Sequence, residues 1–283
     1  RGQGIWARGA LVMVALGALA TVSADAMGKE PLRLAPSSNW HLNYSADSCR
    51  LARSFGKEKK DEVVLVLDQF EPGPAVNLTL TGTPVGGGSV SRKVEVLFGA
   101  GEPEQGREFE VGKMESGQPA MIILGSVIVG GKDAAQNAAI TSVEIRVRGK
   151  QAVLLETGSM AAPMKALAAC TDDLLRGWKI DVEAHRDLTR SVTPTSNPGY
   201  WMTSDDYPTA MVARGEQGLV YFRLLVDAAG SPSSCHIQQS TRPAEFDDAV
   251  CKGIMRRAQF KPALDAAGKP IASYYRGSVR FKM

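Results

Sequence analysis

The last third of the chain, from Tyr207 to Met283, carries the pattern that most restricts the fold. The run GLVYFRLLVDAAGSPSSCHI contains an alternating strand from Leu219 to Val226, followed by a turn with Gly where a positive φ is needed. A second strand through Cys235 and Ile237 should return beside the first as a hairpin. This region therefore begins with two antiparallel strands.

A helix and a final strand follow this hairpin. Acidic residues fill the first turn after Pro243, and the apolar Phe246, Val250 and Ile254 recur at helical spacing. An apolar stripe of this kind must cover a sheet. We expect a last long strand from Ile271 to Phe281, which gives the order β-β-α-β and an α+β domain.

The same residues carry a resemblance to a known family. The shared features are Tyr207-Pro208 with Gly215 downstream, the VDxxG hairpin, a helix ending in Met255-Arg256-Arg257, and FKPA followed by GKP. Together they resemble the C-terminal domain of the TonB family over 207–283. In that family the domain lies in the periplasm and binds a short box peptide of an outer-membrane receptor, which adds as a strand beside the final strand. The resemblance implies a TonB-dependent outer-membrane receptor, or another envelope protein, as the partner.

The partner-binding residues are therefore expected on the last strand, where a terminal strand leaves backbone groups free for strand addition. They are Ile271, Ser273, Tyr274, Tyr275, Arg276, Val279 and Phe281. One alternative is a homodimer through the same strand. The other is that Arg276, Arg280 and Lys282 protect the edge and that it binds nothing.

The first stretch, 1–26, has the form of a secretory signal peptide. Arg1 and Arg8 give a basic start, an apolar run extends from Ala10 to Val22, and Ala24-Asp25-Ala26 supplies small residues. The run is shorter than the about 20 residues that span a bilayer. We expect export to the periplasm with this segment cleaved, and retention as an inner-membrane anchor is the alternative.

Two features of anchored TonB transducers are missing from this sequence. The apolar run contains neither Ser nor His, and the 15 prolines are scattered and form no extended spacer. The sequence therefore favours a binding role over the transmission of force.

The cysteine count indicates two disulfides. Four cysteines in an exported chain suggest pairing, because the bacterial periplasm is oxidising. The division into domains pairs Cys235 with Cys251, and Cys49 with Cys170. We expect no metal site, since no C-x-x-C is present and the three histidines are scattered. The net charge of +3 comes from dispersed residues, so nothing indicates nucleic-acid binding.

The region 27–183 reads as a β-rich domain, either a sandwich or a rolled sheet, closed by one helix between Pro163 and Gly177. The expected strands are Trp40–Tyr44, Cys49–Phe55, Val63–Phe70, Asn77–Thr81, Val94–Phe98, Met121–Val129 and Ala139–Val147. The polar segment 184–206 has little periodicity, which predicts a linker to the domain at 207–283. The overall fold class is therefore α+β.

We expect no enzyme and no cofactor. LLETGS at 154–159 is similar to the aspartic-protease signature, but it has Glu in place of Asp and no second copy. No G-x-S-x-G is present. The main hypothesis is a periplasmic protein that binds receptor or envelope peptides by strand addition in TonB-dependent transport. The alternative is that the N-terminal domain binds a ligand or acts as a hydrolase, and the C-terminal domain only docks it.

Overall fold

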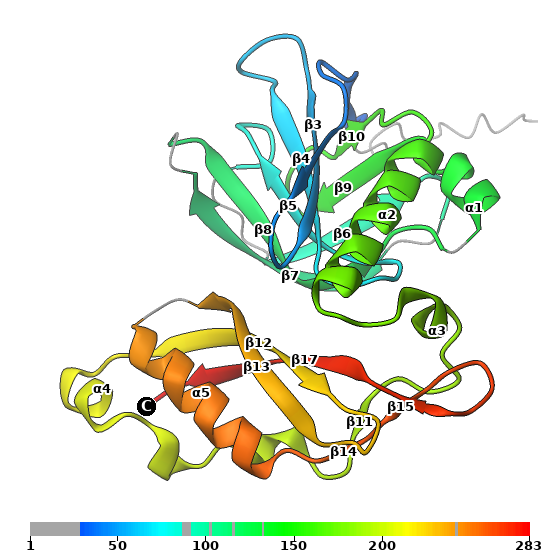
Figure 1. Ribbon diagram of the computed structural model, residues 1–283. Helices are drawn as coiled ribbons and strands as arrows, with labels where there is room; N and C mark the ends of the chain where they lie inside the picture. Colours follow the sequence, from blue (N-terminus) through cyan, green and yellow to red (C-terminus); the bar gives the residue numbers. More distant parts are fainter. Residues whose placement is uncertain (1–28, 87–91, 102–103, 115–116, 132, 241–242) are drawn as a thin grey trace, which may run out of the picture.

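The computed structural model describes residues 29–86, 92–101, 104–114, 117–131, 133–240 and 243–283. A large β-rich region and a smaller α/β region lie one above the other in Figure 1. This arrangement confirms the α+β class. The signal peptide expected at 1–26 lies outside the described residues.

The N-terminal region is built on one mixed sheet. Its strands are β1 (Leu32–Leu34), β2 (His41–Tyr44), β3 (Cys49–Phe55), β4 (Val63–Gln69), β5 (Ala75–Thr81), β6 (Lys93–Phe98), β7 (Glu104–Lys113), β8 (Pro119–Ile128), β9 (Val143–Val147) and β10 (Val153–Leu155). Within the described residues these form a 10-stranded sheet in the order β1-β10-β9-β6-β7-β8-β5-β4-β3-β2. Only β1 and β10 are parallel among these pairs.

This sheet is rolled around a single core. Alternate residues of β4 are buried, as the period of two requires, and they share one hydrophobic cluster with residues from β6 and β9 at the other end of the sheet. Pro36, just after β1, forms a bridge to Phe55 on β3. The two ends of the sheet are therefore close together, which supports the rolled alternative over the sandwich.

Helix α2 (Ala161–Gly177) covers the open side of the roll, and the short α1 (Ala134–Ala139) lies beside it (Figure 1). Leu167 and Cys170 on α2 are fully buried. A disulfide of 1.98 Å joins Cys170 to Cys49 on β3, as the division into domains predicted. This bond ties the helix to the strand next to the edge of the sheet.

Some details of the expected elements in the N-terminal region were wrong. The strand expected over Ala139–Val147 begins only at Val143, because Asp133 caps α1 and the helix uses the residues before it. Gly177, expected as the stop just after the helix, is instead the last residue of α2, and the left-handed conformation falls at Lys179, with φ 61°.

The segment expected as a linker is ordered and packs on the C-terminal region. It contains α3 (Val182–Arg186), β11 (Thr193–Pro194), η2 (Pro198–Tyr200) and η3 (Ser204–Asp206). Val192 and Trp201 are buried in the C-terminal core, whereas Val182 belongs to the N-terminal core. The chain therefore passes from one core to the other between these residues, while the domain boundaries themselves stay a prediction.

The C-terminal region has the expected order of two strands, a helix and a last strand. Its elements are α4 (Thr209–Arg214), β12 (Gly218–Val226), β13 (Pro232–Ser240), α5 (Ala244–Arg257), β14 (Phe260–Lys261), β15 (Ala263–Leu264), β16 (Pro270–Ile271) and β17 (Ser273–Phe281). Three of them form an antiparallel sheet in the order β13-β12-β17. The short pairs β11-β14 and β15-β16 lie outside it in the described ranges.

Helix α5 covers one face of this sheet (Figure 1). Its Phe246, Val250 and Ile254 are buried against the alternating Val220 and Phe222 of β12. A disulfide between Cys235 on β13 and Cys251 on α5 adds a covalent link, again as expected. At the hairpin turn, Gly230 has φ 87°, and a Cβ there would lie 2.0 Å from the carbonyl oxygen of Phe260. Glycine is therefore required at this turn.

Candidate functional site

The candidate site is the outer edge of β17. This strand pairs with β12 along its whole length, from Gly218 opposite Phe281 to Val226 opposite Ser273. No strand pairs with its other side in the described part of the chain, nor does any backbone hydrogen bond outside the sheet involve β17 there. Because alternate N–H and C=O groups of an edge strand point away from the sheet, this edge can accept one more strand.

The side chains of β17 on the α5 side belong to the core. Phe281 stacks on Phe246 with ring centroids 4.3 Å apart. Tyr275 contacts the rings of Trp201 and Phe260 at 5.4 and 5.1 Å. Val279 packs against the same cluster. These three expected partner-binding residues therefore hold the strand in place, and a partner would meet the backbone between them.

The side chains on the opposite face contact the N-terminal region. Tyr274 packs edge-on against Trp178 at 5.4 Å. Arg276 forms an ion pair with Glu71 at 3.2 Å and lies over the ring of Phe70. Burial raises the pKa of the Tyr274 hydroxyl well above its usual range, and the neighbouring Glu71 carboxylate raises it further.

Two further expected residues lie at the beginning of this edge. Ile271 is not part of the last strand, because it pairs with Ala263 in the separate β15-β16 ladder, so the expected strand from Ile271 to Phe281 starts two residues too early. Ser273 is the first residue of β17 and is buried, with its hydroxyl oxygen 2.8 Å from Nε2 of His185. The structure thus brings six of the seven expected residues together on one strand.

The contact between the two regions depends on residues that the sequence did not single out. Asp47, in the turn between β2 and β3, accepts a hydrogen bond from Arg223 at 2.8 Å. Its other carboxylate oxygen lies 2.8 Å from Nε2 of His236. The Arg223 guanidinium lies 3.9 Å from the centroid of the Trp178 ring, and burial lowers its pKa. We call Asp47, Glu71, Arg223, His236 and Arg276 the interdomain clasp.

Only one signal for the clasp was present in the sequence. Side chains alternate along β13, so His236 lies on the face opposite Cys235: Cys235 bonds to α5, whereas His236 faces Asp47. Arg223 on β12 follows the same alternation. Nothing in the sequence pattern indicated that this face would meet another domain.

A second ion pair holds α5 to the segment before β12. Arg257 donates two hydrogen bonds to the Asp206 carboxylate, at 2.8 and 3.0 Å, and a third to the carbonyl oxygen of Trp201. The hydrogen bonds from Arg257 lower the pKa of Asp206 to about 2, and those from Thr203 act in the same direction. Asp206 thus fixes the segment that carries Trp201 against the core.

Comparison with known proteins agrees with this geometry. The family described as "Gram-negative bacterial TonB protein C-terminal" matches residues 204–283. Residues 204–283 are a TonB C-terminal domain. Protein tonB2 of Pseudomonas aeruginosa is 37% identical over 71 residues, which make up 25% of this chain and 26% of that protein. The likeness thus covers about a quarter of either chain.

The TonB C-terminal domain is a non-enzymatic domain, and together with the two disulfides it points to the cell envelope. No helix in the described ranges is both long and apolar enough to cross a membrane. In the same ranges, no three His, Cys, Asp or Glu side chains gather where they could hold a metal ion.

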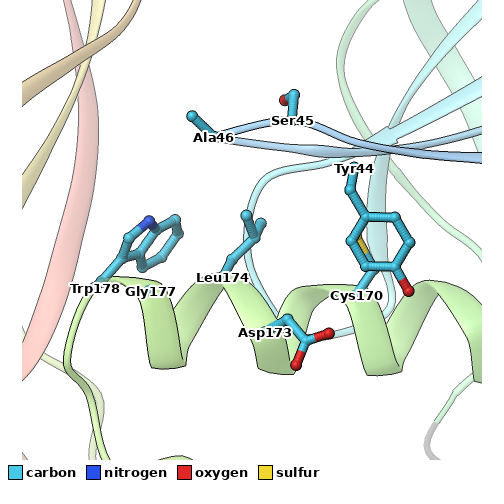
Figure 2. A pocket seen from close by; sticks show the side chains of 8 residues that line it. All are labelled: Tyr44, Ser45, Ala46, Cys170, Asp173, Leu174, Gly177 and Trp178. Carbon is cyan, nitrogen blue, oxygen red and sulfur yellow. The ribbon is translucent and has the colours of Figure 1, made fainter.

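The N-terminal region contains a hollow of about 260 Å³ between the β2–β3 turn and α2. It is lined by Tyr44, Ser45, Ala46, Cys170, Asp173, Leu174, Gly177 and Trp178. In Figure 2, Tyr44 and Cys170 lie toward one end of the hollow and Trp178 toward the other. The volume falls below the about 300 to 1,000 Å³ of typical small-molecule sites. Its one carboxylate, Asp173, pairs with Arg176, so the hollow offers no pair of acids.

Proposed function

We propose that this chain is a periplasmic interaction protein of TonB-dependent transport. Its TonB C-terminal domain binds a short extended segment of an outer-membrane receptor, or of another envelope protein, as a fourth strand beside β17. The observation that carries this proposal is the open edge of β17, which is held rigid by an aromatic core and has no backbone partner outside the sheet in the described residues.

The side chains of β17 support a backbone-driven mode of binding. The core contains the side chains of Tyr275, Val279 and Phe281. The N-terminal region contacts those of Tyr274 and Arg276. Main-chain hydrogen bonds then supply affinity, and the side chains of the partner supply specificity. Proline at Tyr275 is a poor test, because the ring it removes contacts Trp201 and Phe260 and the domain would unfold.

A backbone-modified peptide tests the proposal without altering the protein. The probe is the box peptide of a TonB-dependent receptor, N-methylated at three alternate residues, in two versions that carry the complementary alternate sets. Only one set faces β17. Each lost hydrogen bond costs about 1 kcal/mol, so that version should bind about 100-fold more weakly, while the other binds nearly as well as the parent peptide.

Isothermal titration against the full chain gives the three affinities. Equal weakening by both methylated versions, or no binding of the parent peptide, would contradict strand addition. A circular dichroism spectrum of each peptide alone controls for any change that methylation makes in the free peptide.

A ligand-binding role for the N-terminal region is the second candidate, and the hollow beside Tyr44 is the observation that favours it. Tyr44 is 57% exposed, so its ring is open to a ligand beside the hollow. A ligand seated there should raise the melting temperature of the wild-type chain but not of Tyr44→Ala. A screen in which no compound separates the two proteins would remove this candidate.

A further inference from the structure

The beginning of β17 is closed by the chain itself. Nε2 of His185 lies 2.8 Å from the hydroxyl of Ser273, and its ring stacks on Tyr274 with centroids 5.4 Å apart. The side chains of Ser273 and Tyr274 leave the strand on opposite faces. An imidazole that meets both must lie across the beginning of the strand, so α3 occupies the place where an added strand would extend past Tyr274.

The next residues are closed on one face. Besides its ion pair with Glu71, Arg276 donates a hydrogen bond to Gln238 on β13 at 2.8 Å. Trp178 covers Tyr274 from the same direction. The N-terminal region thus covers the face opposite α5 as far as Arg276.

The remainder of the strand is open and positively charged. Ser278 and Arg280 are exposed on that same face, and Lys282 follows two residues later. In the described part of the chain, Arg280 and Lys282 have no ion-pair partner, whereas the cations Arg223 and Arg276 of the clasp each have one. An extended segment lying beside Gly277–Phe281 would place alternate side chains next to these two cations.

We propose that the N-terminal region and α3 form an end stop on β17, so that the open part of the strand takes a short extended segment carrying an acidic side chain. The proposal rests on the proposed function, since it assumes strand addition at the same edge. The stop fixes the register of the added strand, because pairing cannot extend past Tyr274. The carboxylate of the segment then pairs with Arg280 or Lys282 on a half-solvated surface.

The charge preference is tested with three versions of the box peptide, with Glu, Gln or Lys at both ends. Against the full chain, the Glu version should bind about 10-fold more tightly than the Gln version, and the Lys version should bind most weakly. The double variant Arg280→Glu/Lys282→Glu should reverse this order. The control Lys252→Glu makes the same kind of charge change at an exposed residue of α5, on the other face of the sheet. It should leave the order of the three peptide affinities unchanged.

The end stop is tested by NMR of the isotope-labelled full chain during titration with the Glu peptide. Amide signals should shift from Tyr275 to Lys282, while those of Ser273 and Tyr274 and the ring signals of His185 stay in place. Shifts that reach Ser273 and His185 would overturn the stop. In the same titration, His185→Ala should let the shifts extend to Ser273.

The outcomes separate the two proposals. If only one of the two N-methylated peptides binds weakly, but the Glu, Gln and Lys peptides bind equally well, strand addition stands and the preference for an acidic segment is overturned. No binding of any version would contradict strand addition, and with it the end stop.

Discussion

Single ionisable side chains fasten the elements of the C-terminal region to one another. Asp206 is the clearest case, because its carboxylate receives two hydrogen bonds from Arg257 and one from the backbone of Thr203. The pKa of Asp206 falls to about 2 from an ordinary value of 3.8. A depressed pKa means that the ionised acid stabilises the fold above pH 4, and that this stabilisation is lost as the pH falls toward 2.

We expect Asp206→Asn to lower the free energy of unfolding by about 1 kcal/mol at pH 7, after allowance for solvent screening. The difference in the free energy of unfolding between the variant and the wild type should shrink between pH 4 and pH 2 and vanish below pH 2. Urea unfolding across this range measures it, with the exposed neighbour Asp205→Asn as control. A constant difference at every pH would show that the ionised carboxylate is not responsible.

His185 makes a prediction of the same direction at a higher pH. Burial lowers its pKa below the ordinary 6.5, although the charge of Glu71 raises it in part. The unfolded chain then binds a proton more readily than the folded chain, so stability falls as the pH drops through 6.5 and levels off below the folded pKa. The variant His185→Gln should lose this pH dependence. Thermal melting at pH 7.5 and 5.5 compares the two, and an identical pH effect in both would contradict the assignment.

Elements with a strong residue pattern could be predicted from the sequence. Val63–Gln69, Gly218–Val226 and α5 have the periods of a strand and a helix, and the structure places them there. The missed strands lack that signal. β7 contains EQGREFEVGK, in which Gly and charged residues interrupt the alternation, and β1 and β10 have only three residues each. Strands as short as β1 and β10 are defined by their partners more than by their own residues.

Only part of the candidate site could be predicted from the sequence. The resemblance located the strand, but the expected set did not separate core side chains, such as Tyr275 and Phe281, from those on the opposite face. The clasp was missed because an isolated Asp47 in a polar turn, or an Arg on one face of a strand, has the same pattern as a solvated surface residue. Its partners lie more than 170 residues away in the chain, and only the folded structure brings them together.

The two disulfides should differ in their effect on stability. Cys49 and Cys170 are separated by 121 residues, and Cys235 and Cys251 by 16. Loop-closure entropy then gives about 5 kcal/mol for the first and about 3 kcal/mol for the second. Scanning calorimetry of Cys49→Ala/Cys170→Ala and of Cys235→Ala/Cys251→Ala checks this. Equal losses, or a larger loss for the second pair, would contradict the entropic account.

At the scale of the whole molecule, the clasp determines how the two regions sit together. Asp47 joins both Arg223 and His236, and Arg223 is only 8% exposed, so removing the carboxylate leaves a buried cation without its partner. Asp47→Asn should weaken docking by about 2 kcal/mol.

The variant should show faster amide exchange in β12 and β13 and a larger radius of gyration by X-ray scattering. Glu144→Gln is the matched control, because Glu144 pairs with Arg146 within β9, a strand that carries none of the clasp residues. Unchanged exchange and scattering in Asp47→Asn would mean that the apolar contacts of Trp178 and Tyr274 are sufficient for docking.

The disulfide between β3 and α2 also has a mechanical meaning. A pull applied to the chain ahead of β1 and resisted by a partner held on β17 would pass along the chain to Cys49 and then cross directly to Cys170. The 121 residues of sequence separation between these cysteines, which include most of the rolled sheet, lie outside that loaded path. Tension would reach α2 and α3 through a covalent shortcut, so the central strands β4 to β9 would be spared, while the edge strands β1 and β2 stay within the loaded path.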